Sequence, residues 1–297
     1  MTLPSDNLEV PIPLSTLLGD YPTTHALRTG ALKSAALPLV FADVAVPNRA
    51  FKRAVRELEF DVTELALMTF LMARSRDVPL YLLPVVVFAR NPLPYLVCDR
   101  ERRLLRPDDL GGCRIGVRAY ATTTAVWIRA LLRDRFQVAF DDVKWITLED
   151  GHVAGVPDPP SASRAGSSAH LVSMLRDGAV DAAIIDPVPN EPWLAEVVPD
   201  PASTYAAWRK QHGARTLNHI VAVRESVARD EPVTRELFRL FTESRDLAGV
   251  ESRAMPFGLE DNRRNLEAAI AAASAQGLLA RELTVAGLVT GALASLT

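Results

Sequence analysis

The chain has 297 residues, of which 48% are hydrophobic and 23% are charged. This length corresponds to roughly two domains, and the apolar fraction suffices for packed cores, so a globally disordered chain is excluded. The 33 lysine and arginine residues against 36 aspartate and glutamate residues give a formal net charge of −3, which argues against a dedicated nucleic-acid-binding protein.

Two cysteines, Cys98 and Cys113, are too few for a disulfide framework or a cysteine-rich zinc site. Both have apolar neighbours, so we expect buried thiols in a reducing compartment. The segment Met1–Asp6 has neither the basic nor the apolar region of a signal peptide. The longest apolar stretch, Val78–Ala89, is too short for a transmembrane helix. We therefore expect a soluble, cytoplasmic protein without a membrane partner.

Short apolar runs typical of buried strands alternate with amphipathic stretches typical of helices, which predicts an α/β architecture. In chain order, the predicted strands are 59–62, 80–88, 113–117, 179–185 and 219–223. The predicted helices are 65–74, 123–135, 233–241 and 266–276, the last of them capped by Gly277. The stretch 155–168 is rich in proline, serine and glycine and lacks periodicity, so it is predicted to be a mobile surface loop.

No clean linker divides the chain. The central section, residues 93–213, has the pattern of a complete α/β unit inserted between two other parts. We therefore predict two lobes, with residues 1–92 and 214–297 in lobe I and residues 93–213 in lobe II. A chain that crosses between lobes twice leaves a cleft between them, and such clefts are favoured ligand sites.

The strongest local signal for a ligand site is the strand–turn–helix pattern over 113–135. Thr122, Thr123 and Thr124 open the predicted helix, where they can cap free N–H groups. The same N–H groups bind anions such as carboxylates, and Arg118 at the strand end can add positive charge. Alternatively the threonines only cap the helix and Arg118 is solvated, and spacing alone favours this second interpretation.

Glu64 and His219 are the two candidates for acid–base chemistry. Glu64 follows the predicted strand 59–62, and α/β proteins place ligand contacts at strand ends. Its carboxylate can hydrogen-bond a phenol or act as a base, and it can equally well interact with the dipole of a helix start. His219 lies in the alternating stretch 217–221, where a histidine is more often a satisfied core residue than a catalyst.

Recognised metal and cofactor motifs are absent from the sequence. No two histidines have the i, i+4 spacing of a zinc helix with a glutamate between them. The chain has no GxSxG elbow, P-loop or GxGxxG motif, and the glycines of 111–116 precede a strand instead of opening a helix. We expect no metal site, nucleotide or redox cofactor, although a divalent ion held by distant segments stays open.

Five segments in order resemble the 4,5-dihydroxyphthalate decarboxylase family. They are Leu17–Leu27, Glu59–Leu65, Gly116–Arg129, His219–Arg224 and Phe257–Leu278. The resemblance covers nearly the whole chain, least clearly over 150–212, and implies a type 2 periplasmic-binding-protein fold with the ligand between two α/β lobes. Pro22–His25 replaces a family segment with two arginines. This departure concerns the substrate more than the fold, and Arg118 would supply the positive charge instead.

The resemblance implies a carboxy-lyase that decarboxylates a hydroxylated aromatic carboxylic acid, similar to 4,5-dihydroxyphthalate, and releases carbon dioxide without oxidation. Such a reaction needs an acid for the ring carbon, an acceptor for the phenol, and cationic or N–H groups for a second carboxylate. We assign His219, which falls on a histidine of the family's strand, as the proton donor and Glu64 as the partner of the phenol. The expected substrate-binding residues are Arg118, Tyr120, Thr122, Thr123 and Asp186, and Asp186 at the end of strand 179–185 is also a second candidate for the acid.

Two other functions stay open. The same fold serves non-catalytic solute-binding or sensor proteins for aromatic or heterocyclic acids, and a related enzyme could carry out another reaction on such an acid in a biosynthetic pathway. In each case the expected partner is a small aromatic acid, not a nucleic acid or a membrane. An exposed apolar face on helix 266–276 would be compatible with a homodimer, but an internal contact explains such a face equally well.

Overall fold

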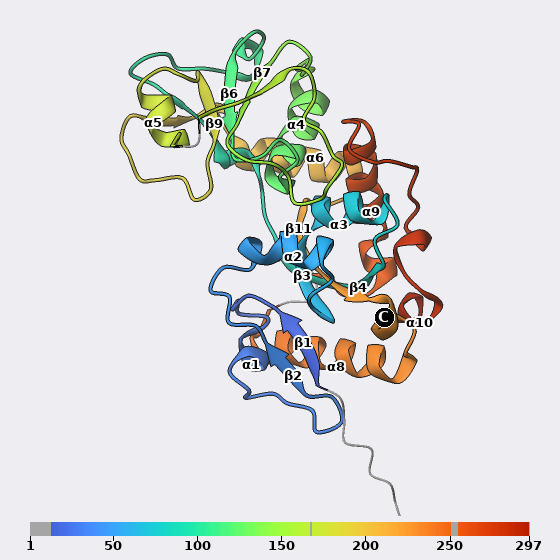
Figure 1. Ribbon diagram of the computed structural model, residues 1–297. Coiled ribbons are helices and arrows are strands. Elements are labelled where there is room, and N and C mark those ends of the chain that lie inside the picture. The colour runs from blue at the N-terminus through green and yellow to red at the C-terminus, as the bar shows by residue number, and fades with distance from the viewer. Residues whose placement is uncertain (1–12, 167, 251–254, 297) are drawn as a thin grey trace, which may run out of the picture.

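The computed structural model describes residues 13–166, 168–250 and 255–296. Within these residues the strands form two sheets, one of five strands and one of six. Figure 1 shows the six-stranded sheet at the top and the five-stranded sheet below it, with helices α3 (Leu67–Arg74) and α9 (Leu259–Ser274) between them. We call the part around the five-stranded sheet the first lobe and the other part the second lobe. The segment Met1–Asp6 lies outside the described residues.

The first lobe contains a mixed sheet with the strand order β2-β1-β3-β11-β4. β1 is parallel to β2 and β3, whereas β11 is antiparallel to β3 and β4. β11 enters this sheet only after the chain has built the second lobe, so residues far apart in sequence become neighbours. The strands are β1 (Leu14–Leu17), β2 (Leu39–Phe41), β3 (Val62–Ala66), β4 (Leu80–Ala89) and β11 (Leu217–Arg224).

The second lobe contains a sheet with the strand order β10-β5-β9-β6-β7-β8. β6 is parallel to β7 and β9, and the carboxyl ends of these parallel strands face the first lobe at the cavity described below. The strands are β5 (Leu96–Asp99), β6 (Arg114–Val117), β7 (Lys144–Thr147), β8 (Ala162–Arg164), β9 (Ala182–Ile184) and β10 (Leu194–Glu196).

Helices cover the sheets and connect the lobes. Asp230 caps α8 (Glu231–Leu247) by accepting the N–H of Val233 (3.1 Å), and Asp200 caps α6 (Pro201–His212) by accepting that of Ser203 (2.9 Å). The remaining α-helices are α1 (His25–Arg28), α2 (Phe51–Arg56), α4 (Thr123–Phe136), α5 (Leu171–Arg176), α7 (Glu225–Ala228) and α10 (Gly291–Ala294). Short 3₁₀ helices are η1 (Pro47–Ala50), η2 (Leu93–Tyr95), η3 (Pro107–Asp109) and η4 (Ala286–Leu288).

Two predictions of local structure were wrong. The strand expected at 59–62 is displaced along the chain: β3 begins only at Val62 and continues to Ala66, so Glu64 lies inside a strand and not at a helix start. β3 pairs with β1 on one side and β11 on the other, and this pairing outweighs the helical pattern that begins at Leu65. The stretch 155–168 is also more than a loop, because its residues 162–164 form β8 beside β7.

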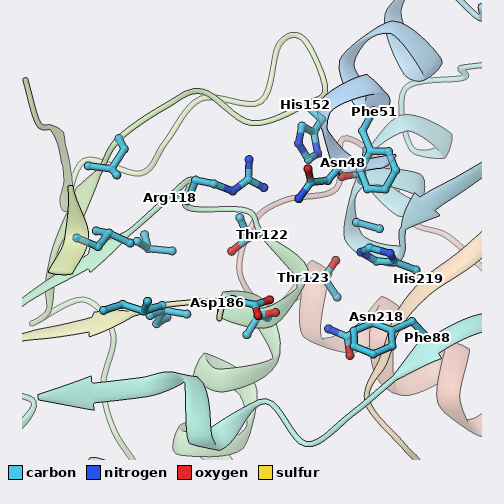
Figure 2. Close-up of a pocket in the computed structure, with 18 of the residues that line it drawn as sticks. Asn48, Phe51, Phe88, Arg118, Thr122, Thr123, His152, Asp186, Asn218 and His219 are labelled. Atoms are coloured by element: carbon cyan, nitrogen blue, oxygen red, sulfur yellow. Dashed lines mark hydrogen bonds between the residues drawn. The ribbon is translucent and has the colours of Figure 1, made fainter. Parts of the chain in front are cut away.

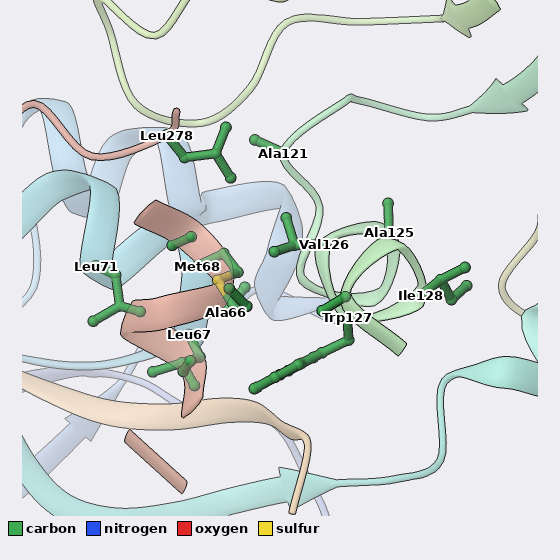
Figure 3. Close-up of a cluster of buried hydrophobic side chains, with 14 of the residues drawn as sticks. Ala66, Leu67, Met68, Leu71, Ala121, Ala125, Val126, Trp127, Ile128 and Leu278 are labelled. Atoms are coloured by element: carbon green, nitrogen blue, oxygen red, sulfur yellow. The ribbon is translucent and has the colours of Figure 1, made fainter. Parts of the chain in front are cut away.

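A hydrophobic cluster joins the two lobes. Figure 3 shows Met68 of α3 close to Val126 of α4, and these side chains are buried in one core with Leu71 and Trp127. The Trp127 indole N–H also donates to the carbonyl of Leu217 on β11, at 2.8 Å. Burial of apolar surface together with satisfied polar atoms stabilises this junction. The N-terminal ends of α3 and α4 are therefore held side by side at the cavity.

Cys98 and Cys113 are free and buried, as predicted, and burial raises the pKa of both thiols. No helix among the described residues is long and apolar enough to cross a membrane. The Ala-rich helix α9 packs against α3 and α4, and its apolar residues Leu266, Ala269 and Ala273 belong to the core that these helices share. An internal contact therefore accounts for the apolar face of this helix.

Candidate active site

A cavity of about 440 Å³ lies between the two lobes. Residues of β3, α3, β4 and β11 line its first-lobe side, and residues that follow β6, β7 and β9 line its second-lobe side (Figure 2). Clefts at the carboxyl ends of parallel strands and at the junction of lobes are common ligand sites, and this volume accommodates a small organic acid.

His219 and Glu64 lie on the neighbouring strands β11 and β3. The strands are paired so that Val221 faces Glu64, and the His219 side chain reaches back to the carboxylate. Nδ1 of His219 lies 2.5 Å from Oε1 of Glu64. Since the carboxylate occupies Nδ1, Nε2 is the imidazole nitrogen that remains for a ligand in the cavity that His219 lines.

Glu64 is completely buried, and three donors surround its carboxylate. Besides His219, the N–H of Gly19 donates to Oε2 and the hydroxyl of Tyr21 donates to Oε1, each at 2.7 Å. Burial and the negative charge of Glu64 raise the pKa of Tyr21 well above its usual value, so this hydroxyl remains a donor. These contacts compensate the cost of burying a carboxylate.

Glu64 does not line the cavity, which corrects the expectation that it contacts a phenol directly. Its side chain is 0% exposed and lies behind the imidazole of His219. β3 is the central strand of the five-stranded sheet, and all five of its residues are buried. Glu64 therefore acts on the cavity only through His219.

Arg118, Thr122 and Thr123 lie on the second-lobe side of the cavity. The guanidinium of Arg118 forms an ion pair with Glu149, and both side chains are partly exposed. Thr122 precedes α4 in an extended conformation without a side-chain cap, and Thr123 Oγ1 accepts the N–H of Met68 at 3.1 Å. The expected threonine cap is therefore wrong. The first turn of this 14-residue helix lines the cavity, and its dipole favours an anion there.

Asp186 also lines the cavity, just after β9, and Arg90 neutralises it. Arg90 donates to Asp186 Oδ1 (Nη1, 3.1 Å) and to Thr124 Oγ1 (Nη2, 3.4 Å). Its guanidinium also lies 3.8 Å from the ring centroid of Tyr95. Arg90, which the sequence analysis did not place at the site, thus adds a second cation to the second-lobe side.

Tyr120 lies outside the cavity lining, which corrects its expected role in substrate binding. Its ring packs edge-on against Trp145, with centroids 5.7 Å apart, and the guanidinium of Arg129 lies 3.9 Å from its centroid. Arg129 is completely buried, and burial lowers its pKa to about 10. Tyr120 therefore belongs to the core of the second lobe, where it helps to cover a buried cation.

Sequence reasoning missed His152, which lines the cavity beside the predicted residues. Its Nδ1 lies 2.9 Å from Oγ1 of Thr69 on α3, and its ring contacts Phe51 edge-on. Desolvation lowers the pKa of His152 to about 3, with a further contribution from nearby positive charges. Its position after β7, at the ligand-binding edge of a parallel sheet, was the available signal.

Asn218, the neighbour of His219 on β11, was missed as well. It lines the cavity although it is only 2% exposed. Its Oδ1 atom is buried and has no hydrogen-bond partner among the described residues. Since buried polar atoms in proteins are nearly always satisfied, a donor group of a ligand is well suited to this atom.

No group of three or more His, Cys, Asp or Glu side chains within 13–166, 168–250 and 255–296 is arranged to hold a metal ion.

No family model matches the sequence. A 4,5-dihydroxyphthalate decarboxylase from Comamonas testosteroni is 26% identical over 276 residues, which cover 85% of this chain and 82% of the relative. A protein of the same name from Pseudomonas putida is 26% identical over 209 residues, covering 66% of this chain and 80% of the relative. The resemblance seen in the sequence is confirmed.

Solved structures show the fold. The periplasmic aliphatic sulphonate binding protein SsuA from Escherichia coli matches with a TM-score of 0.57 at 12% identity, covering 94% of this chain and 92% of that one. A Candida albicans protein described as having the generic periplasmic binding protein fold matches with a TM-score of 0.51 at 14% identity, covering 92% of this chain and 93% of that one. A DSZB mutant in complex with biphenyl-2-sulfinic acid matches with a TM-score of 0.52 at 16% identity, covering 95% of this chain and 97% of that one. The chain has the predicted two-lobed periplasmic-binding-protein fold.

Proposed function

We propose that this protein removes the carboxyl group of a hydroxylated aromatic carboxylic acid as carbon dioxide, without oxidation. The observation that carries the proposal is the pair formed by His219, at the cavity wall, and the buried carboxylate of Glu64. The two curated relatives, both named 4,5-dihydroxyphthalate decarboxylase, support the reaction class. The cavity volume suits an acid with a single aromatic ring.

The chemistry requires a proton at the ring carbon that bears the carboxylate. A ring hydroxyl ortho or para to that carbon raises its electron density. His219 Nε2–H transfers a proton to the carbon, the bond to the carboxylate breaks, and its electron pair returns to the ring as aromaticity is restored. One proton is consumed for each carbon dioxide released, and solvent reprotonates the histidine. The balance needs neither an oxidant nor a reductant.

Glu64 prepares His219 for this step. The carboxylate orients the imidazole through Nδ1 and balances the positive charge of the imidazolium form. Gly19 and Tyr21 fix the carboxylate in turn, so the geometry exists before the substrate binds. Groups that need no rearrangement during the reaction stabilise a transition state most effectively.

The second-lobe wall supplies the groups that hold a carboxylate of the substrate. The first turn of α4 offers backbone N–H groups, with Thr122 and Thr123 beside them, and Arg118 offers a guanidinium for bidentate pairing. The ion pair between Arg90 and Asp186 closes this side of the cavity. A substrate held there by an acid group presents its ring to His219 across the cavity.

The test is carbon dioxide release from a panel of hydroxylated benzoates and phthalates that includes 4,5-dihydroxyphthalate, with and without EDTA. His219→Ala should lower turnover about 100-fold or more, the usual range for loss of a general acid. The matched control is His25→Ala, because this side chain is 63% exposed and outside the cavity. Undiminished turnover in the folded His219→Ala variant would remove the histidine from the mechanism.

A non-catalytic binding protein for the same acids is the second candidate. It is favoured by the fold, which this chain shares with a protein named for sulphonate binding. Thermal stabilisation by acids of the panel without release of carbon dioxide would support this candidate and refute the decarboxylase.

A further inference from the structure

A second histidine accompanies His219 in the cavity and has no role in the reaction proposed above. Figure 2 shows His152 and His219 next to the same aromatic ring, that of Phe51. Each imidazole makes an edge-on contact with this ring, at a centroid distance of 5.5 Å. The two histidines thus lie on one side of the cavity although they come from different lobes.

The first lobe holds His152 in place even though the residue belongs to the loop after β7. Arg56, at the end of α2, donates from Nε to the carbonyl of His152 (2.8 Å) and from Nη2 to that of Gly151 (3.2 Å). Thr69 on α3 binds the imidazole at Nδ1. Two contacts to the loop backbone and one to the ring therefore fix His152 against the first lobe.

Because Thr69 occupies Nδ1 of His152, Nε2 is the ring nitrogen that remains for a ligand in the cavity that this residue lines. One nitrogen of a neutral imidazole donates and the other accepts, so Nε2 can either donate to or accept from a ligand hydroxyl. The residue is only 8% exposed, so a hydrogen bond from a ligand to this nitrogen would be well shielded from water. A ligand that carries an O–H group can form this bond.

The two histidines differ in their charged neighbours. His219 contacts the carboxylate of Glu64, whereas the groups that act on His152 are cationic or neutral: Arg118, Lys52, His219 and Arg56. Burial together with these groups keeps the pKa of His152 low, at about 3, so the ring is neutral near pH 7. The cavity therefore offers a charge-balanced proton donor and a neutral imidazole side by side.

We propose that His152 recognises the ring hydroxyl of the substrate through a hydrogen bond to Nε2 while the carbon to be protonated faces His219. This inference rests on the proposed function. It narrows the substrate class to acids in which a ring hydroxyl reaches His152 while the carbon that bears the carboxylate faces His219. His152 is thus a specificity-determining residue.

The experiment compares two ligands in the His219→Ala variant, in which turnover is slow enough for binding to be measured. Calorimetry measures the affinities for 4,5-dihydroxyphthalate and for phthalate, which lacks both hydroxyls. We expect about tenfold tighter binding of the dihydroxylated acid, the contribution of one buried hydrogen bond. Adding His152→Leu should abolish this preference and change the affinity for phthalate by less than about twofold, whereas adding His25→Ala should leave the preference intact.

A second pair of variants tests the same proposal if His152→Leu does not fold. Glutamine can place an amide oxygen near the position of Nε2, whereas asparagine is too short and reaches only the position of Nδ1. The preference should therefore persist in His152→Gln and disappear in His152→Asn. The two amides differ by one methylene, so a purely structural role for His152 would not separate them in this way.

The outcomes distinguish this inference from the proposed function. The role of His152 is overturned if the preference for the dihydroxylated acid survives in His152→Leu and His152→Asn. It is also overturned if the His219→Ala parent shows no such preference. Both conclusions hold whether or not the wild-type protein decarboxylates the acids. A preference that depends on His152, in a protein that releases no carbon dioxide, supports hydroxyl recognition and refutes decarboxylation.

Discussion

The two walls of the cavity carry charge in different ways. Behind the first-lobe wall the charge of Glu64 is completely buried and compensated by three donors, one of which is the wall residue His219. On the second-lobe wall the side chains of Arg118 and Asp186 are 42% and 45% exposed, and each is paired with one opposite charge. Exposed ion pairs contribute only about 0–1 kcal/mol, whereas a buried charge that loses a partner costs several kcal/mol. The first-lobe side thus fixes the geometry of the His219–Glu64 pair. On the second-lobe side, an acidic ligand can replace the carboxylate that is paired with Arg118.

The strongest test of this contrast is Glu64→Gln. The amide keeps the volume of the side chain but removes the charge that balances an imidazolium at His219. We expect kcat to fall about 100-fold while the fold persists, because the proton donor loses its orienting partner. Rates of carbon dioxide release, with thermal unfolding as a check on the fold, measure this effect.

Glu57→Gln is the matched control for that substitution, since Glu57 is exposed at the end of α2. It should keep wild-type kcat. If the folded Glu64→Gln protein turned over as fast as this control, the buried wall would have no part in the chemistry.

A second test uses the buried histidine. A histidine with its unperturbed pKa of 6.5 takes up a proton below that pH in the unfolded chain, whereas His152 in the folded protein does so only near pH 3. The free energy of unfolding therefore falls as the pH drops through this window. Between pH 7 and 4.5, His152 should account for a loss of about 2–3 kcal/mol.

Urea unfolding of wild type and His152→Gln at both pH values measures this loss. The glutamine variant cannot titrate at this position, so its stability should decline less on acidification, by the stated amount. Equal declines in the two proteins would show that the imidazole is not protected from protonation in the folded state.

The smallest expected effect is on the exposed wall. Arg118→Ala should raise KM about tenfold and leave kcat within about twofold, because the guanidinium contributes to binding and not to proton transfer. Arg164→Ala is the control, since Arg164 has a similarly exposed side chain paired with Asp150 and Asp158 but lies outside the cavity lining. A drop in kcat instead of a rise in KM would assign Arg118 to the chemical step.

Local patterns predicted much of the fold because they reflect burial. The alternation at 217–221 and the apolar run at 80–88 correspond to β11 and β4, and the helix expected at 123–135 corresponds to α4. His219 and Glu64 were found from their positions on strands. Their hydrogen bond could not be predicted, because 155 residues separate them and only the register of β11 against β3 brings them together.

The errors have equally physical causes. Tyr120 matches a family segment, but no pattern shows that a buried Arg129 needs its ring as a cover. His152 lies in an irregular stretch, and its place in the cavity depends on Thr69 and Arg56 of the other lobe. Both cases involve contacts between segments far apart in sequence, which periodicity and local motifs do not report.

The anchoring of the His152 loop by Arg56 has a mechanical consequence. His219 and Glu64 are both mounted on the first lobe, whereas His152 is carried by the second and only fastened to the first. Swinging the lobes apart would break the two Arg56 contacts and withdraw His152 from the ring of Phe51, yet leave the carboxylate–imidazole pair assembled. Separation of the lobes would thus move His152, the proposed partner of the ring hydroxyl, away from His219, while His219 would keep its hydrogen bond to Glu64.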